Sequence, residues 1–251
     1  MPTPEPIAIA SRSPSPTAAL VRRPLYVALS VLIGTIAIGG FWVTYFGSLV
    51  RGTGTTSQPL LIHAHAAVFV GWLVLFLTQT VLAAVGRVRA HRALGQAGIW
   101  YGVFLVLMGL WTAVSRSAYH MRTSGSGEGL LFVALLDMAI FAPFFGAAIV
   151  YRRQPQVHKR LMVVAATMLL VAAVGRFWFL PAPPMDLLVS SAIWFSPVLM
   201  GMAHDWATSR RVHPVYVLGL AAFVFRLASP AFVIGTPAWS SIARLITSAV
   251  G

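Results

Sequence analysis

The chain of 251 residues is 58% hydrophobic and only 9% charged, whereas a soluble domain carries roughly 25% charged residues. Cysteine is absent, which excludes disulfides, thiol chemistry and cysteine-ligated metal centres. The formal net charge of +13 comes from short basic clusters between apolar blocks, a pattern typical of the loops of a membrane protein rather than of a nucleic-acid-binding surface. The composition therefore predicts an integral membrane protein whose surroundings are the lipid bilayer, with no nucleic-acid partner.

Residues 1–22 are rich in Pro, Ser and Ala and are predicted to form a disordered cytoplasmic tail. Residues 23–235 contain repeated apolar blocks, each long enough to cross the ~30 Å hydrocarbon core as a helix. Seven spans are expected, at about 25–46, 61–85, 96–118, 129–151, 160–180, 186–204 and 214–235. The predicted fold class is an all-α membrane protein, a bundle of about seven transmembrane helices.

Basic loops alternate with nearly uncharged loops along the whole chain. By the positive-inside rule the basic loops are cytoplasmic, so the N-terminus is expected inside and the C-terminus outside. The large excess of Arg over Lys, with abundant Ala and Val, is typical of GC-rich bacterial genes. We therefore expect the chain to lie in a bacterial inner membrane.

Three of the basic loops have a common form. They read R-V-R-A-H-R at 87–92, R-Q-P-Q-V-H-K-R at 153–160 and R-R-V-H-P at 210–214. Each contains a histidine at or just before the next predicted helix. This pattern predicts three helical hairpins of related design, preceded by one extra helix.

The last predicted element is a short helix over residues 236–251. Thr236 and Pro237 read as an N-cap followed by proline at the first helical position. Trp239, Ile242, Ile246 and Val250 then fall near one helical face, which favours an interfacial helix on the outer surface over another span.

A set of short motifs recurs through the spans and loops. They are H-A-H-A at 63–66 with Trp72 and Gln79, H-R-A-L-G at 91–95, Asp137, H-K-R-L-M at 158–162 leading to Gly175 and Arg176, R-V-H-P at 211–214, and G-T-P-A-W at 235–239. In these motifs, which cover most of residues 60–245, the chain resembles uncharacterised bacterial multi-pass membrane proteins of the DUF2306 type. The resemblance implies a membrane protein of that kind and brings no activity with it.

Ionisable residues inside the predicted spans are the first candidates for function, because a charge in hydrocarbon is costly. Asp137, Arg176 and Arg226 are all expected in the outer half of the bundle, where two arginines would bracket one aspartate. Such a group serves either as a structural ion pair or in proton or anion handling. Gln79 ends a stripe of aromatic and polar side chains on the second span that begins at His65.

The histidines divide between the two ends of the bundle. His63, His65 and His120 are expected toward the outside, and His91, His158, His204 and His213 toward the cytoplasm. Two such clusters suggest b-type haem held by imidazoles from different helices, in the manner of cytochrome b561-like proteins. The outer ligands would be His65 or His63 with His120, and the inner ligands His91 with His158. The alternative is that these histidines are interfacial and bind no cofactor.

Two further points bound the function. A zinc site at His63 and His65 requires the second span to begin after His65, because residues two apart diverge on a helix. The nucleotide-binding, serine-hydrolase and zinc-protease motifs are absent. Two hypotheses follow: a haem-binding membrane redox protein, and a non-redox small-solute or proton transporter, or accessory subunit, centred on Asp137 and its arginines.

Overall fold

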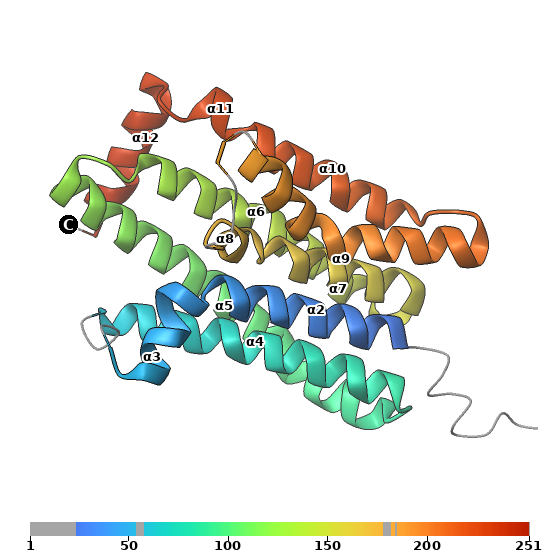
Figure 1. Cartoon of the computed structure of the whole chain (residues 1–251). Helices are drawn as coiled ribbons and strands as arrows, with labels where there is room; N and C mark the ends of the chain where they lie inside the picture. The colour runs from blue at the N-terminus through green and yellow to red at the C-terminus, as the bar shows by residue number, and fades with distance from the viewer. Residues whose placement is uncertain (1–23, 54–57, 178–181, 184, 251) are drawn as a thin grey trace, which may run out of the picture.

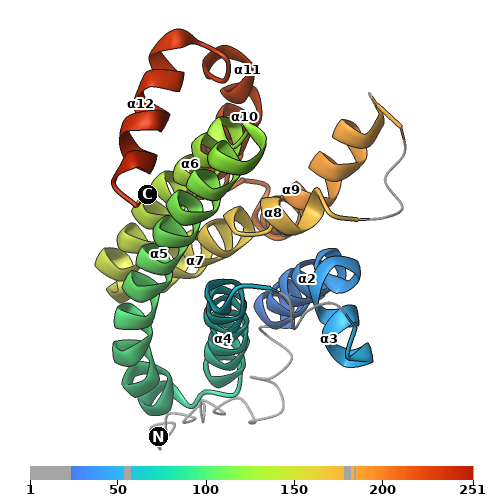
Figure 2. The same ribbon diagram turned by 90° about the vertical axis from the view of Figure 1, so that its left-hand side faces the viewer.

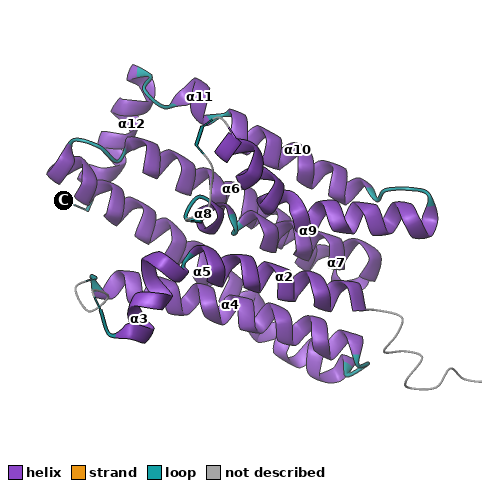
Figure 3. Ribbon diagram, viewed as in Figure 1, coloured by secondary structure: helices purple, strands orange, loops and turns teal. Residues whose placement is uncertain are grey.

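The computed structural model of the chain describes residues 24–53, 58–177, 182–183 and 185–250, and within these ranges every regular element is a helix (Figures 1 and 3). The predicted tail over residues 1–22 lies outside the described residues. The elements are, in chain order, α2 (Pro24–Gly40), the π-helix η1 (Trp42–Phe46), α3 (Gly47–Arg51), α4 (Leu60–Ala84), α5 (Val88–Ser124), α6 (Glu128–Val150), the 3-10 helix η3 (Tyr151–Arg153), α7 (Pro155–Met168), α8 (Val171–Val174), α9 (Met185–Ser209), α10 (Pro214–Ala228), α11 (Pro230–Val233) and α12 (Pro237–Ser248).

The described helices confirm a multi-pass membrane bundle. Six spans are long and apolar enough to cross a bilayer: α4, α5, α6 with η3, α7 with α8, α9, and α10 with α11. A seventh is possible where α2 meets the η1–α3 segment, but the two parts are bent by 52°. The first span was predicted as one continuous helix over 25–46, and that part of the prediction is wrong because the α-helix gives way to η1 after Gly40.

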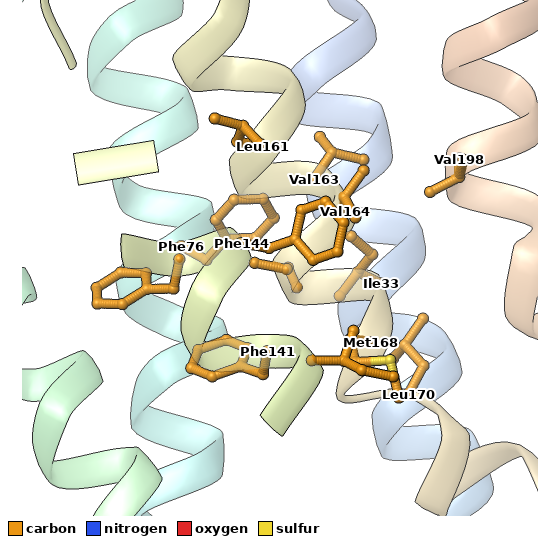
Figure 4. Close-up of a cluster of buried hydrophobic side chains, with 14 of the residues drawn as sticks. Ile33, Phe76, Phe141, Phe144, Leu161, Val163, Val164, Met168, Leu170 and Val198 are labelled. Atoms are coloured by element: carbon orange, nitrogen blue, oxygen red, sulfur yellow. The ribbon is translucent and has the colours of Figure 1, made fainter. Parts of the chain in front are cut away.

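Helix α7 is the centre of the packing. It contacts α6, α10, α9 and α2, and its residues from Val163 to Met168 are almost completely buried. Ile33 of α2, Phe141 and Phe144 of α6 and Val198 of α9 surround it (Figure 4). This apolar core fixes the positions of the helices that carry the buried polar side chains.

Helix α2 also packs closely against α8. A Cβ atom at Gly40 would overlap the backbone carbonyl of Ala173, so only glycine permits this approach. The bend into η1 comes directly after this contact, and α2 lies beside α4 (Figure 2).

Two of the three basic loops close their hairpins in the same way. His91 Nδ1 lies 3.2 Å from the Gln79 carbonyl oxygen, and His158 Nδ1 lies 2.7 Å from the Ala148 carbonyl oxygen. In each case an imidazole in the first turn of a helix reaches back to the preceding helix. The third loop differs, because His213 caps α10 by accepting a hydrogen bond from the Val215 amide at 3.3 Å.

The C-terminal helix begins as the sequence predicts, with the Thr236 hydroxyl accepting a hydrogen bond from the Trp239 amide at 3.3 Å. It packs against α5 and α6, and the Trp239 indole donates to the Glu128 carbonyl at 3.0 Å. Ile242, on the predicted apolar face, is 48% exposed and does not pack against α5 or α6. The small residues Ala243 and Thr247, which lie in line with Trp239, form the buried face because they permit close contact with α5.

Candidate functional site

A cavity of about 430 Å³ lies in the half of the bundle opposite the basic loops, between α2–η1, α4, α5, α6 and the α7–α8 region. We call it the outer cavity. Its walls are mainly apolar, with Phe41, Phe69, Trp72 and Leu73 among the side chains that line it. A smaller set of polar side chains also lines it: Thr44, Tyr45, Gln58, His65, Thr112, Arg116, His120, Asp137 and Arg176. Four of the nine sequence-predicted site residues, His65, His120, Asp137 and Arg176, therefore meet at one cavity.

His65 occupies the second turn of α4. Its ring packs against Phe69 with a centroid separation of 4.3 Å and planes tilted by 30°, as the predicted stripe on this helix implies. Its Nδ1 atom is buried and has no hydrogen-bond partner among the described residues. A buried, unpaired ring nitrogen at a cavity wall is available to a bound molecule, because leaving it unsatisfied costs free energy.

His63, two residues earlier, points elsewhere and does not line the cavity. Its Nδ1 atom lies 2.7 Å from the hydroxyl of Tyr45, which does line it. The two histidines thus separate as the helical spacing predicts. α4 begins at Leu60, before both of them, so His63 and His65 lie on one regular helix and cannot share a metal ion there.

Arg116 and His120 form a pair one turn apart on α5. A guanidinium nitrogen of Arg116 lies 3.3 Å from His120 Nε2. Since guanidinium only donates hydrogen bonds, Nε2 is the acceptor and the imidazole proton resides on Nδ1. Sequence reasoning missed Arg116 because it lies at the end of a predicted span, although its i, i+4 spacing to His120 was a usable signal.

Asp137 of α6 forms a buried ion pair with Arg226 of α10 through Arg226 Nε. The two side chains are 12% and 9% exposed. Arg176 makes no hydrogen bond to Asp137. It donates instead to the Ala172 carbonyl, and its guanidinium lies 4.8 Å from the centroid of the Phe41 ring. Asp137 is therefore paired by one arginine rather than bracketed by two.

Gln79, His91 and His158 lie at the basic-loop end, away from the outer cavity. The His91 and His158 ring centroids are 6.5 Å apart with planes at 85°. Gln79 Oε1 is buried and has no hydrogen-bond partner among the described residues. The structure thus brings together the inner histidine pair that the sequence predicts.

A second hollow of about 360 Å³ at the same end is lined by Arg160, Asp205 and the 209–214 turn. Arg160 and Asp205 form a bidentate ion pair, with Nε–Oδ2 at 2.9 Å and Nη2–Oδ1 at 2.5 Å. Asp205 Oδ2 also accepts a hydrogen bond from the His213 backbone amide, with a nitrogen–oxygen distance of 3.2 Å. Sequence reasoning did not single out Asp205, although an acid five residues before the basic 210–214 loop was a signal for such a pair.

Across the described part of the chain, no three His, Cys, Asp or Glu side chains gather where they could hold a metal ion. No known family model matches the chain, and no curated protein and no solved structure is significantly similar to it. The resemblance to DUF2306-type proteins therefore stays a prediction.

Proposed function

We propose that this multi-pass membrane protein binds a small amphipathic anion, a monocarboxylate with an apolar body, in the outer cavity. The observation that supports this proposal is the convergence of two arginines and an unpaired imidazole on a mainly apolar cavity within the membrane bundle. Binding pockets for small molecules commonly combine apolar walls with a few convergent polar groups.

The charge balance of the cavity favours an anion. Arg116 and Arg176 each contribute one positive charge, whereas the Asp137 carboxylate is paired with Arg226. The net charge around the cavity is therefore positive. In a region of low dielectric constant such a charge attracts a carboxylate strongly, because little water screens it.

The walls define the other end of the ligand. Aromatic and aliphatic side chains from α2, α4 and α7–α8 offer no partner to a second polar group along most of the surface. A volume of about 430 Å³ lies within the range of roughly 300–1,000 Å³ usual for small-molecule pockets. A medium-chain fatty acid combines a single anionic head with an apolar body of suitable size.

The outer pair of histidines gives little support to a haem in this cavity. His120 Nε2 accepts a hydrogen bond from Arg116, so that nitrogen is occupied. His65 Nδ1 is buried and has no hydrogen-bond partner among the described residues. A haem held by two outer histidines would require Arg116 to move away, whereas a carboxylate would use Arg116 as it stands.

The test is a binding titration with the fluorescent fatty acid 11-(dansylamino)undecanoate on protein in nanodiscs. We expect saturable binding that dodecanoate displaces and that dodecanol and dodecylamine displace poorly. Arg176→Gln and Arg116→Gln should each weaken binding about 10- to 100-fold, since each removes a charge-assisted hydrogen bond of roughly 1.5–3 kcal/mol. The matched control is Arg122→Gln, an exposed arginine on α5 that does not line the cavity.

Equal displacement by dodecanol would contradict the proposal, as would equal weakening by the control variant. Transport is a separate prediction, tested by fatty-acid flux into proteoliposomes with a pH-sensitive dye inside. Flux that is lost in Arg176→Gln and kept in Arg122→Gln would support a transporter. Binding without protein-dependent flux would leave a binding protein.

A further inference from the structure

The inner histidines have a tautomer set by the backbone. Nδ1 of His91 faces the Gln79 carbonyl oxygen and Nδ1 of His158 faces the Ala148 carbonyl oxygen. A carbonyl oxygen only accepts hydrogen bonds, so each Nδ1 carries the proton and each Nε2 keeps its lone pair. Neither Nε2 has a hydrogen-bond partner among the described residues. Histidines that bind metals are commonly held in this way, with the second ring nitrogen donating to a backbone carbonyl.

The separation of the two rings suits one shared metal centre. A metal–nitrogen bond of about 2.0–2.1 Å places the metal roughly 3.2 Å from the imidazole centre, so two ligands on opposite sides have ring centres about 6.4 Å apart. The observed separation of His91 and His158 is 6.5 Å. Perpendicular ring planes are compatible with this arrangement, because each ring can rotate about its own metal–nitrogen bond.

A third polar residue, Gln79, lies next to His91. Gln79 supplies the carbonyl that holds His91, while its side-chain Oε1 is buried and unpaired. Its Nε2 lies 3.4 Å from the position that a Cβ of Gly95 would take. Gly95 follows His91 by one turn on α5, so the amide lies along the helix face that carries His91.

We propose that His91 and His158 bind one transition-metal centre through their Nε2 atoms, on opposite sides of the metal, with Gln79 beside them as an oxygen donor. Two imidazoles in this arrangement suit a metal of tetragonal geometry. Such a metal is supplied either as a free ion of the Cu²⁺ or Ni²⁺ class or as the iron of a haem. The site is independent of the outer cavity and does not rest on the function proposed there.

The first arm of the test is a Cu²⁺ titration of the full chain, without a polyhistidine tag, followed by electron paramagnetic resonance. Coupling to two imidazole nitrogens is expected. His91→Asn and His158→Asn are the informative variants, because the asparagine amide replaces the Nδ1 donor to the carbonyl and removes Nε2. Each should weaken Cu²⁺ binding more than about 10-fold and reduce the signal to one imidazole. The exposed His204 gives the control, His204→Asn.

The second arm is the oxidised and dithionite-reduced absorption spectrum of the protein after addition of haem. A Soret band with sharp α and β bands, lost in His91→Asn and His158→Asn and kept in His204→Asn, would support the site with iron as its metal. Two-imidazole Cu²⁺ coupling without such a spectrum would support a free ion. Neither signal in wild type, or signals that survive both informative variants, would overturn the proposal and leave the histidines as hairpin contacts only.

Discussion

Replacement of Arg226 by methionine should destabilise the protein far more than replacement of both members of its ion pair. Asp137 and Arg226 are only 12% and 9% exposed, so Arg226→Met leaves a buried carboxylate without its cation. Removal of one partner from a buried pair costs about 3–5 kcal/mol. In the variant Asp137→Leu/Arg226→Met both charges are absent, and no uncompensated charge remains. We expect this double variant to lose less free energy of unfolding than either single variant.

The assay is unfolding in mixed micelles with increasing SDS, followed by tryptophan fluorescence, for the wild type, both single variants and the double variant. A coupling energy near 3 kcal/mol corresponds to a factor of roughly 150 in the unfolding equilibrium. The double variant should also bind 11-(dansylamino)undecanoate within about threefold of wild type, because the pair contributes no net charge to the cavity. Single-variant losses below about 1 kcal/mol, or losses that simply add, would refute this account of the pair.

Three other predictions concern the scaffold. Gly40→Ala should cost about 1–3 kcal/mol in the same assay because its Cβ would overlap the Ala173 carbonyl, whereas Gly34→Ala, with no neighbouring atom within 4 Å, should be neutral or gain up to about 1 kcal/mol. Burial, aided by a nearby guanidinium, lowers the pKa of His213 below its ordinary value of 6.5. The unfolded chain therefore binds more protons near that pH, and stability should fall as pH drops from 7.5 to 5.5. His213→Asn, which keeps a capping side chain, should flatten this dependence in SDS unfolding measured at each pH. Thr236→Ala should cost about 1 kcal/mol and speed amide hydrogen exchange in α12, because it removes the N-cap.

The bilayer explains why most of the fold could be predicted from the sequence. Each span must satisfy its backbone internally and face hydrocarbon, so long apolar blocks permit little except helices. The Thr236–Pro237 start of α12 was predictable because capping depends on neighbouring residues alone. The break after Gly40 was not predictable from the sequence, because the first span contains no internal proline. It accompanies the close contact with Ala173, which only the packed structure reveals.

The candidate sites also combine features that the sequence could predict with features that only the packed structure reveals. A carboxylate and a guanidinium within the membrane predict each other, because neither is stable alone there, so the Asp137 and Arg226 pair was within reach of the sequence. The sequence could not predict which arginine pairs with Asp137, because Arg176 and Arg226 lie on different helices. The outer cavity itself required knowledge of which helices are neighbours. Arg116 lines the cavity because α5 packs against α4 and α6.

The length of α5 sets where the outer cavity meets water. Its 37 residues, at about 1.5 Å each, give a rod of roughly 55 Å, whereas the hydrocarbon layer is ~30 Å thick. From Ser115 onward the helix becomes polar, so this end continues past the hydrocarbon into the headgroup layer, where α12 rests against it. Arg116 and His120, which lie just after Ser115, therefore line the part of the cavity nearest to the headgroup layer. An anion would enter from that layer head-last, with its apolar body advancing into the bundle and its charge remaining beside the arginines.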